Sequence, residues 1–463
     1  MVYIKSIILT LFLLLCLHMS NAQIEKLCGL WMDTLKVNND VMLRLVFSIE
    51  KQNDIVVIFA DSPDQYVKNI PITNYSFSDD TLILTIHSLG ASFKGVYDQV
   101  KHVIVGTFKQ SSMKFPIQLE RIPERIVWNR PQTPKKPYPY TTEDIDFLSA
   151  DKSTLLSGTL CLPQGEGPFP LVILISGSGW QDRDESIFGH KPFLVIADYL
   201  ACNGVASFRY DDRKMDRYLV STTMDLSKDT EGAWKYFSKD QRFNKIGLMG
   251  HSEGGIIALM LASRNKKIDF LISLAGLVQE APDVLLYQIN VWCNTMKFSE
   301  EENQVCQTMN RDIFTLIQTE KKTDKLSVKL DEMYISFSQI YTSDILTRIG
   351  FSPNEFMAKK MQLTNPWYLY FIRMKPKKYA VKVRCPVLAL NGNKDMQVPF
   401  ENIRLLEKYL IPNPSSEFYV MDGLNHLFQV ANSGLVEEYG KIEETISEEV
   451  LHKMVLFIKK IIK

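Results

Sequence analysis

One stretch of the chain decides the fold: Lys245-Ile246-Gly247-Leu248-Met249-Gly250-His251-Ser252-Glu253-Gly254-Gly255. Its apolar first half is typical of a buried strand, and residues 256–261 continue with the apolar pattern of a helix. Gly-x-Ser-x-Gly between a strand and a helix predicts a tight turn from which the serine hydroxyl projects, with glycines where the backbone is too crowded for a side chain. The amides that open the helix face the same point, where negative charge develops in acyl transfer. The pattern therefore predicts Ser252 as a nucleophile.

A serine nucleophile needs a general base whose pKa lies near the working pH, and in practice this is a histidine. Six histidines follow residue 22: His87, His102, His190, His251, His426 and His452. The first two fall in a β-rich N-terminal region, and the last falls in a C-terminal helical stretch. His190 is expected on the oxyanion side of the site, and the ring of His251 should point away from the serine hydroxyl. His426 follows the strand-like residues 416–420 and is therefore the predicted base.

The third group is a carboxylate that holds the histidine tautomer, and in this kind of fold it lies between serine and histidine in chain order. Asp395 fits, because it follows the strand-like residues 387–390 in a loop that contains a glycine. Asp422 is the alternative, but it lies four residues before His426 on the same loop and is better placed to cap a turn. We therefore predict a triad of Ser252, Asp395 and His426.

The oxyanion that forms during acyl transfer needs two backbone amide donors. One is expected from Glu253, the residue after the nucleophile, and one from the loop Ser176-Gly177-Ser178-Gly179-Trp180. We predict Ser178 as the second donor, with Gly179 as the next choice. A glycine-rich turn after a strand can also hold phosphate, but neither GxGxxG nor GxxxxGK is completed here, which argues against a nucleotide site.

Around this stretch, apolar runs alternate with helical stretches, which is the pattern of a mainly parallel sheet covered by helices. The runs that read as buried strands cover residues 170–175, 205–208, 245–249 and 386–390. An insertion over about residues 277–382 precedes the last of them and predicts helices at 283–296, 300–319 and 329–341. A lid is expected there. Its aromatic residues are candidate pocket walls, although aromatics in a helical lid more often serve packing: Trp292, Trp367, Tyr368, Tyr370 and Phe371.

The first 22 residues read as a cleaved secretory signal, because Lys5 precedes an apolar run over 7–17 and then the small-residue sequence Ser20-Asn21-Ala22. The mature chain would start at Gln23 and be periplasmic or secreted. The run is shorter than the roughly 20 residues that span a bilayer, so no stable membrane span is predicted and a permanent anchor is the lesser alternative. Acylation of Cys16 is another alternative, but Leu15 is bulkier than such sites usually accept.

Short alternating runs bounded by Asn, Asp or Gly predict an antiparallel β domain over residues 23–121, a small barrel or sandwich in which Gly95 and Gly106 bracket one strand pair. A proline-rich linker follows over residues 122–143, where closely spaced prolines favour an extended chain. The α/β domain then occupies residues 144–463.

The chain of 463 residues carries 53 basic and 53 acidic side chains, so no net field attracts polyanions and nucleic acid is not an expected partner. Six cysteines lie beyond the signal segment, without the close spacing of a metal or redox motif. No metal or cofactor is predicted. Cys293 and Cys306 could form a disulfide in an exported protein, but buried free thiols are the preferred interpretation. The oligomeric state stays open.

Further motifs accompany the predicted triad: Ser62-Pro63-Asp64-Gln65, Gly177-Ser178-Gly179, Asp182-Arg183-Asp184-Glu185, Gly189-His190-Lys191-Pro192-Phe193, Arg209-Tyr210-Asp211-Asp212-Arg213, Asn365-Pro366-Trp367 and Leu424-Asn425-His426-Leu427-Phe428-Gln429. With them the chain resembles bacterial exported α/β-hydrolase esterases that carry an N-terminal β-rich domain, a group related to the serine-aminopeptidase-like hydrolases. The resemblance implies an α/β-hydrolase fold with a helical lid insertion after a small antiparallel β domain, the same triad, and hydrolysis of carboxylic esters. The chain departs from the group at Lys214, where a glycine is usual, and at Trp180, where a proline is common.

Three functions are compatible with these residues. The first is a serine carboxylesterase that hydrolyses short acyl esters, a small-molecule substrate class, through an acyl-enzyme intermediate. The second is a serine peptidase or amidase that uses the same triad, although no Glu or Asp pair in the sequence can be singled out to hold a substrate amino terminus. The third is a secreted binding protein without catalysis, which the complete triad disfavours.

Overall fold

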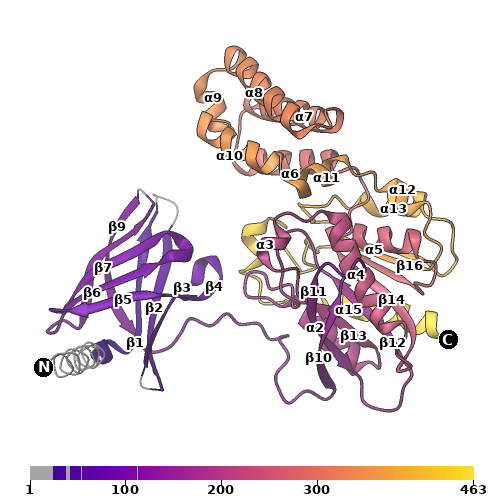
Figure 1. Cartoon of the computed structure of the whole chain (residues 1–463), viewed down its shortest axis with the longest axis horizontal. Helices are drawn as coiled ribbons and strands as arrows, with labels where there is room; N and C mark the ends of the chain where they lie inside the picture. Colours follow the sequence, from indigo (N-terminus) through magenta and orange to yellow (C-terminus); the bar gives the residue numbers. More distant parts are fainter. Residues whose placement is uncertain (1–23, 38–41, 54, 112) are drawn as a thin grey trace, which may run out of the picture. The chain divides into compact units, whose positions relative to one another are not determined.

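The computed structural model describes residues 24–37, 42–53, 55–111 and 113–463 (Figure 1). The predicted signal segment, with Cys16, lies outside these residues. The chain divides into two compact units, each with most of its residue contacts inside itself. The first comprises Met1–Asn129 and Ile187–Gly189, and the second comprises Arg130–Ser186 and His190–Lys463. Among the described residues, no helix has the length and apolar character that crossing a bilayer requires.

In the first unit the described residues form a nine-stranded antiparallel sheet in the order β4-β3-β2-β1-β9-β8-β7-β6-β5, a half-barrel. Alternating side chains of its strands bury one apolar cluster that includes Trp31, Phe47 and Phe93. Gly95 and Gly106 do not bracket a strand pair, as the sequence had suggested, but pair directly with each other within β7 and β8. A Cβ at Gly106 would lie 2.4 Å from the Gly95 Cα, so this close approach of two strands requires glycine. The strands are β1 Gly29–Lys36, β2 Met42–Gln52, β3 Ile55–Ser62, β4 Val67–Pro71, β5 Asn74–Ser78, β6 Thr81–Ile86, β7 Ala91–Asp98, β8 Val103–Gln110 and β9 Met113–Ile122.

In the second unit the described strands form an eight-stranded sheet in the order β10-β11-β13-β12-β14-β15-β16-β17. Strand β11 is antiparallel to both of its neighbours, and every pair from β13 onward is parallel. This order confirms the predicted α/β-hydrolase fold. The strands are β10 Thr141–Leu148, β11 Leu155–Leu162, β12 Phe169–Ile175, β13 Ala206–Tyr210, β14 Phe243–His251, β15 Leu271–Leu274, β16 Val387–Gly392 and β17 Glu417–Met421.

Helices cover both faces of this sheet, which explains why its central strands are apolar throughout. Along β12, Leu171 and Ile173 belong to one buried cluster, whereas Val172 and Leu174 belong to a second. The helices outside the insertion are α2 Pro192–Cys202, α3 Met215–Tyr218, α4 Thr223–Phe237, α5 Glu253–Arg264, α13 Asn402–Tyr409, α14 Val436–Tyr439 and α15 Glu448–Ile462.

The insertion between β15 and β16 is helical, as expected, and α7 to α10 lie farther from the sheet than α6 and α11 (Figure 1). Helix α7 has the predicted bounds, but α8 begins six residues before the predicted start at 329. The reason is Leu326, which is buried one turn before Leu330 and extends the apolar stripe. The helices are α6 Ala281–Thr295, α7 Glu300–Thr319, α8 Thr323–Ile340, α9 Ser343–Arg348, α10 Pro353–Leu363, α11 Pro366–Arg373 and α12 Lys377–Ala380. The described cysteines, Cys293 and Cys306 among them, are free thiols.

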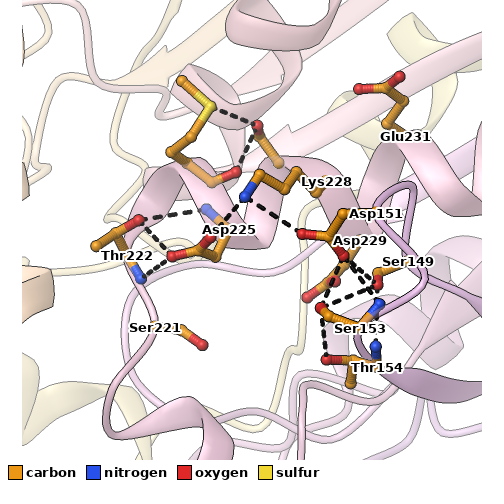
Figure 2. A network of polar contacts seen from close by, with 12 residues as sticks. Ser149, Asp151, Ser153, Thr154, Ser221, Thr222, Asp225, Lys228, Asp229 and Glu231 are labelled. Carbon is orange, nitrogen blue, oxygen red and sulfur yellow. Dashed lines mark hydrogen bonds and ion pairs between the residues drawn. The ribbon is translucent and has the colours of Figure 1, made fainter.

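A polar network ties the turn between β10 and β11 to helix α4 (Figure 2). The Lys228 ammonium on α4 lies 3.0 Å from an Asp225 carboxylate oxygen and 3.3 Å from one of Asp151 in the turn. The Thr222 hydroxyl and the Asp225 carboxylate form a capping box at the N-terminus of the same helix. The network thereby holds the first turn of α4, which contributes a residue to the candidate site.

Candidate active site

Ser252 occupies the single residue between β14 and α5, and its backbone is strained. Its φ of 53° and ψ of −116° lie outside the regions that L-residues normally adopt. A Cβ added to Gly250 would lie 2.0 Å from the Gly254 carbonyl oxygen, and one added to Gly254 would lie 2.1 Å from that of Ile175. Both glycines are therefore required by the packing. Ser252 itself remains partly exposed, although the residues on either side of it are buried.

His426 and Asp395 form a buried pair in loops that follow β17 and β16. The His426 Nδ1 lies 2.7 Å from the Asp395 Oδ2. That carboxylate also accepts hydrogen bonds from the amides of Gln397 and Val398, both at 2.8 Å, and from the Asn391 side chain at 3.0 Å. The carboxylate is thus held from three sides besides the histidine, which fixes the orientation of the imidazole.

The loops that carry Ser252, Asp395 and His426 all follow parallel strands, so they meet at one edge of the sheet. Within the described part of the chain, no hydrogen bond joins the Ser252 hydroxyl to His426. The structure brings His426 and Asp395 into contact and places the serine at the same edge. Catalytic hydrogen bonds are often long in enzymes without substrate and tighten when it binds.

His251, which the sequence places next to the nucleophile, links two loops of the site. Its Nδ1 lies 3.0 Å from the Glu185 Oε1, and its Nε2 lies 3.1 Å from the His426 carbonyl oxygen. Both partners are acceptors, so the ring satisfies both only when each nitrogen carries a proton. Burial lowers the pKa of His251, but the Glu185 carboxylate and these hydrogen bonds outweigh burial and raise it overall. Through these two contacts the ring connects the backbone of His426 to the Glu185 side chain.

The loop after β12 lies against the nucleophile, since a Cβ at Gly177 would be 3.2 Å from the Ser252 Cβ. The Gly177 amide is already used, because it donates to the Glu185 carboxylate at 2.8 Å. The Gly179 amide faces the Tyr218 phenol oxygen. Among the described residues the Ser178 amide has no acceptor, so it is the loop amide available to an oxyanion. The amide of Glu253 opens helix α5, where N–H groups have no partner within the helix.

The Glu253 side chain is almost completely buried, at 2% exposure. Its carboxyl group accepts hydrogen bonds from the hydroxyls of Ser178, at 2.8 Å, and Thr223, at 2.7 Å. The indole N–H of Trp367, on helix α11 of the insertion, is a third donor, at 2.9 Å. Burial raises the pKa of Glu253, and the three hydrogen bonds oppose that rise.

Asp212, which follows β13, braces the same loop. Its carboxyl group accepts a hydrogen bond from the Gln181 amide at 2.8 Å and lies 3.4 Å from the Ser176 hydroxyl. Burial raises the pKa of Asp212 to about 8. Neighbouring carboxyl groups, which include Glu253 and Glu185, raise it further, whereas the hydrogen bond from the Gln181 amide lowers it. The loop after β12 is thus supported by an acid whose pKa lies well above the ordinary value.

We expect the stability of the protein to depend on pH through Asp212. In the unfolded chain this group loses its proton near pH 3.8, whereas in the folded chain it keeps the proton up to about pH 8. Its stabilising contribution is therefore complete below pH 3.8 and is lost as the pH rises towards 8. Asp212→Asn removes the titrating carboxyl group. The Tm of the variant minus the Tm of wild type, measured by calorimetry, should therefore be larger at pH 8.5 than at pH 5.

Asp216→Asn is the matched control, because Asp216 is exposed on the neighbouring helix α3. It should change the Tm equally at the two pH values. A Tm difference between Asp212→Asn and wild type that is the same at pH 5 and pH 8.5 would contradict the prediction.

Sequence reasoning missed the residues that support the site rather than form it. Glu185 and Trp367 were named within motifs, and Trp367 also as a candidate pocket wall, but their hydrogen bonds were not predicted, and Thr223 was not named at all. Their contacts join a loop, a helix start and the helical insertion, which are far apart in the sequence. The signal available for Glu185 was the acidic run after a buried strand. His190, expected on the oxyanion side, is a core histidine with no exposed surface, and its ring contacts Thr445 at 2.9 Å.

No cluster of three or more His, Cys, Asp or Glu side chains suited to a metal ion occurs in the described ranges.

Several known proteins resemble part of this chain. A sequence profile for the alpha/beta hydrolase fold matches residues 214–433. Esterase EstD of Thermotoga maritima is 25% identical over 310 residues, which are 65% of this chain and 65% of that protein, so the match spans just under two thirds of the relative. Of the solved structures, an esterase of Pyrococcus furiosus, Pf2001, aligns at 14% identity and a TM-score of 0.43, over 73% of this chain and 100% of that one. Est1E from Butyrivibrio proteoclasticus aligns at 15% identity and a TM-score of 0.40, over 68% of this chain and 98% of that one.

Proposed function

Because the second unit of this chain is an α/β-hydrolase domain, we propose that the protein is a serine hydrolase of carboxylic esters in which Ser252, His426 and Asp395 act together. The observation that carries the proposal is the convergence of two features at one sheet edge. One is a serine on a strained strand-to-helix turn, and the other is a histidine held at 2.7 Å by a buried carboxylate. This pair of features is the arrangement that activates a hydroxyl for acyl transfer.

The proposed reaction proceeds in two halves. In the first, the Ser252 oxygen attacks the ester carbonyl carbon while the His426 Nε2 takes the hydroxyl proton. The tetrahedral oxyanion is held by the amides of Glu253 and Ser178. The carbon–oxygen bond to the alcohol then breaks, and His426 returns the proton to the leaving alkoxide, which leaves an acyl group on Ser252.

In the second half, His426 takes a proton from a water molecule, which attacks the acyl carbonyl. The second tetrahedral intermediate collapses, the bond between the carbonyl carbon and the Ser252 oxygen breaks, and His426 returns the proton to that oxygen. The acid leaves and the hydroxyl is restored. Asp395 accepts the His426 Nδ1–H in both halves and stabilises the imidazolium that forms in each.

An ester is the proposed substrate, rather than a peptide, and the acyl group is proposed to be short. The supporting observation is the likeness of 310 residues to a protein named an esterase. The competing possibility is amide or peptide hydrolysis on the same three residues, which needs no change in the chemistry but requires protonation of a poorer leaving group.

A direct assay separates the two. Purified protein should hydrolyse nitrophenyl acetate and butyrate faster than nitrophenyl esters of long acyl chains, and should leave aminoacyl nitroanilides essentially untouched. Release of nitrophenol and of nitroaniline is followed by absorbance under the same conditions. Faster cleavage of the anilides would favour the peptidase, and failure to cleave either substrate class would contradict the proposed function.

A further inference from the structure

The Glu253 carboxyl group joins three elements of the hydrolase domain that are far apart in sequence. Its Oε2 accepts the hydroxyl of Ser178 from the loop after β12, at 2.8 Å. Its Oε1 accepts the hydroxyl of Thr223 from the start of α4, at 2.7 Å, and the indole N–H of Trp367 from α11, at 2.9 Å. Both carboxyl oxygens are therefore occupied, and each of the three donors comes from a different segment.

The chemistry of this position is unusual for a packing residue. An acidic side chain is rarely buried without a cation, because leaving water disfavours its charged form. All three hydrogen-bond partners of Glu253 are neutral, and its shifted pKa has no contribution from a cation. An apolar side chain could fill the same volume without this cost. The arrangement therefore points to a role for the carboxyl group that packing alone does not need.

We propose that Glu253 is a positioning residue that links the docking of lid helix α11 to the geometry of the oxyanion hole. This inference rests on the proposed function, in which only the backbone amide of Glu253 has a role. It goes further because it assigns a role to the Glu253 side chain. The Glu253 carboxyl group fixes the Ser178 side chain, and with it the Ser178 amide that faces the oxyanion. Trp367 holds the other oxygen of the same carboxyl group.

The contacts of Oε1 and of Oε2 depend on each other, because the two oxygens belong to one carboxyl group. When α11 is docked, the Trp367 N–H and the Thr223 hydroxyl fix Oε1, so Oε2 stays aimed at Ser178. Without the Trp367 contact, the carboxyl group would lose one of its three anchors and the Ser178 amide would be less well held. Misplacement of a catalytic group by about 1 Å can reduce the rate by roughly 10²-fold.

Substitutions at Glu253 test the link. Glu253→Gln keeps an oxygen for Thr223 and Trp367, and its amide can donate to the Ser178 hydroxyl, so kcat should stay within about threefold of wild type. Glu253→Ala removes all three contacts and should lower kcat by about 10²-fold while KM changes much less, because an oxyanion donor acts mainly in the transition state. If Glu253 had a purely structural role, its substitution would lower the Tm and the amount of active protein but leave kcat per active site unchanged. The number of active sites is measured by titration with a covalent serine reagent.

Two milder variants keep the test decisive if Glu253→Ala does not fold. Trp367→Phe keeps the ring that stacks on Phe371 at 4.9 Å but removes the N–H donor, and Ser178→Ala removes only the hydroxyl. Each should lower kcat by about tenfold, and the double variant should lose less than the product of the two, because both act through one carboxyl group. Trp234→Phe is the matched control, because the buried indole N–H of Trp234 has no hydrogen-bond partner among the described residues, so its removal should leave kcat unchanged.

The outcomes separate this inference from the proposed function. If Ser252→Ala retains ester hydrolysis, the proposed function is wrong. If Ser252→Ala is inactive but Trp367→Phe and Ser178→Ala have wild-type kcat, the link is wrong and the proposed function stands. The link would also be wrong if the loss of kcat in the Ser178→Ala/Trp367→Phe double variant equalled the product of the two single losses. It would be wrong as well if Glu253→Gln lowered kcat as much as that double variant.

Discussion

Ser252→Ala should lower the rate of ester hydrolysis by roughly 10⁶-fold, because the members of a triad act as a unit and the residual rate comes only from binding and the oxyanion donors. The methyl group of alanine fits wherever the serine side chain fits, so the fold should survive the change. The strained turn at φ 53° is a property of the backbone and of the glycines around it. The measurement is kcat/KM for nitrophenyl acetate, together with labelling by a fluorophosphonate, which should modify one site per wild-type chain and none in the variant.

Ser263→Ala is the matched control. Ser263 lies on the same helix α5, and its hydroxyl donates to the Met260 carbonyl oxygen at 2.8 Å, away from the strand-to-helix turn. It should retain wild-type activity and labelling. Activity of the Ser252→Ala protein within tenfold of wild type, after exclusion of a contaminating esterase, would contradict the assignment of the nucleophile.

Asp395→Asn should lower kcat by about 10⁴-fold with little change in KM. The carboxylate accepts a hydrogen bond from the His426 Nδ1–H on Oδ2, at 2.7 Å, and hydrogen bonds from two backbone amides on Oδ1. In the asparagine variant those amides keep the oxygen on their side, so the new NH₂ group faces His426. The imidazole then needs its Nδ1 as an acceptor and carries its proton on Nε2, where it cannot act as a base towards Ser252.

The alternative acid provides the control for this experiment. Asp422 is exposed, and its carboxylate accepts the Asn393 side chain at 2.6 Å, which ties two loops together. Asp422→Asn should therefore keep most of the activity. If Asp422→Asn is the inactive variant and Asp395→Asn is active, the acid has been assigned to the wrong residue.

Much of the fold could be predicted because local patterns specify it. The apolar run before Ser252 and the apolar helix after it correspond to β14 and α5, and the glycines of the turn sit where an added Cβ would overlap backbone atoms. The bounds of α7 also follow from the sequence, because Ser299 and Glu302 form a capping box at its start. The early start of α8 was missed, since only packing reveals that Leu326 is buried.

The candidate site divides in the same way. Chain order and strand ends suffice to nominate Ser252, Asp395 and His426, because residues that follow parallel strands must meet at one sheet edge. The contacts of Glu185 and Glu253 cannot be nominated in this way. Both residues make hydrogen bonds to segments more than 60 residues away, such as Glu185 with His251 across 66 positions and Glu253 with Ser178 across 75.

The order of strands and helices, the strained serine turn and the nomination of an acid and a base are properties of the amino-acid sequence alone, because they follow from periodicity, glycine sterics and the geometry of parallel sheets. Only the tertiary structure decided which acid contacts His426, that His251 joins Glu185 to the His426 backbone, and that the buried Glu253 carboxyl group connects helix α11 to the loop after β12. The physical reason is that a hydrogen bond depends on distances of a few tenths of an ångström between groups brought together by packing, and sequence spacing carries no information about such distances.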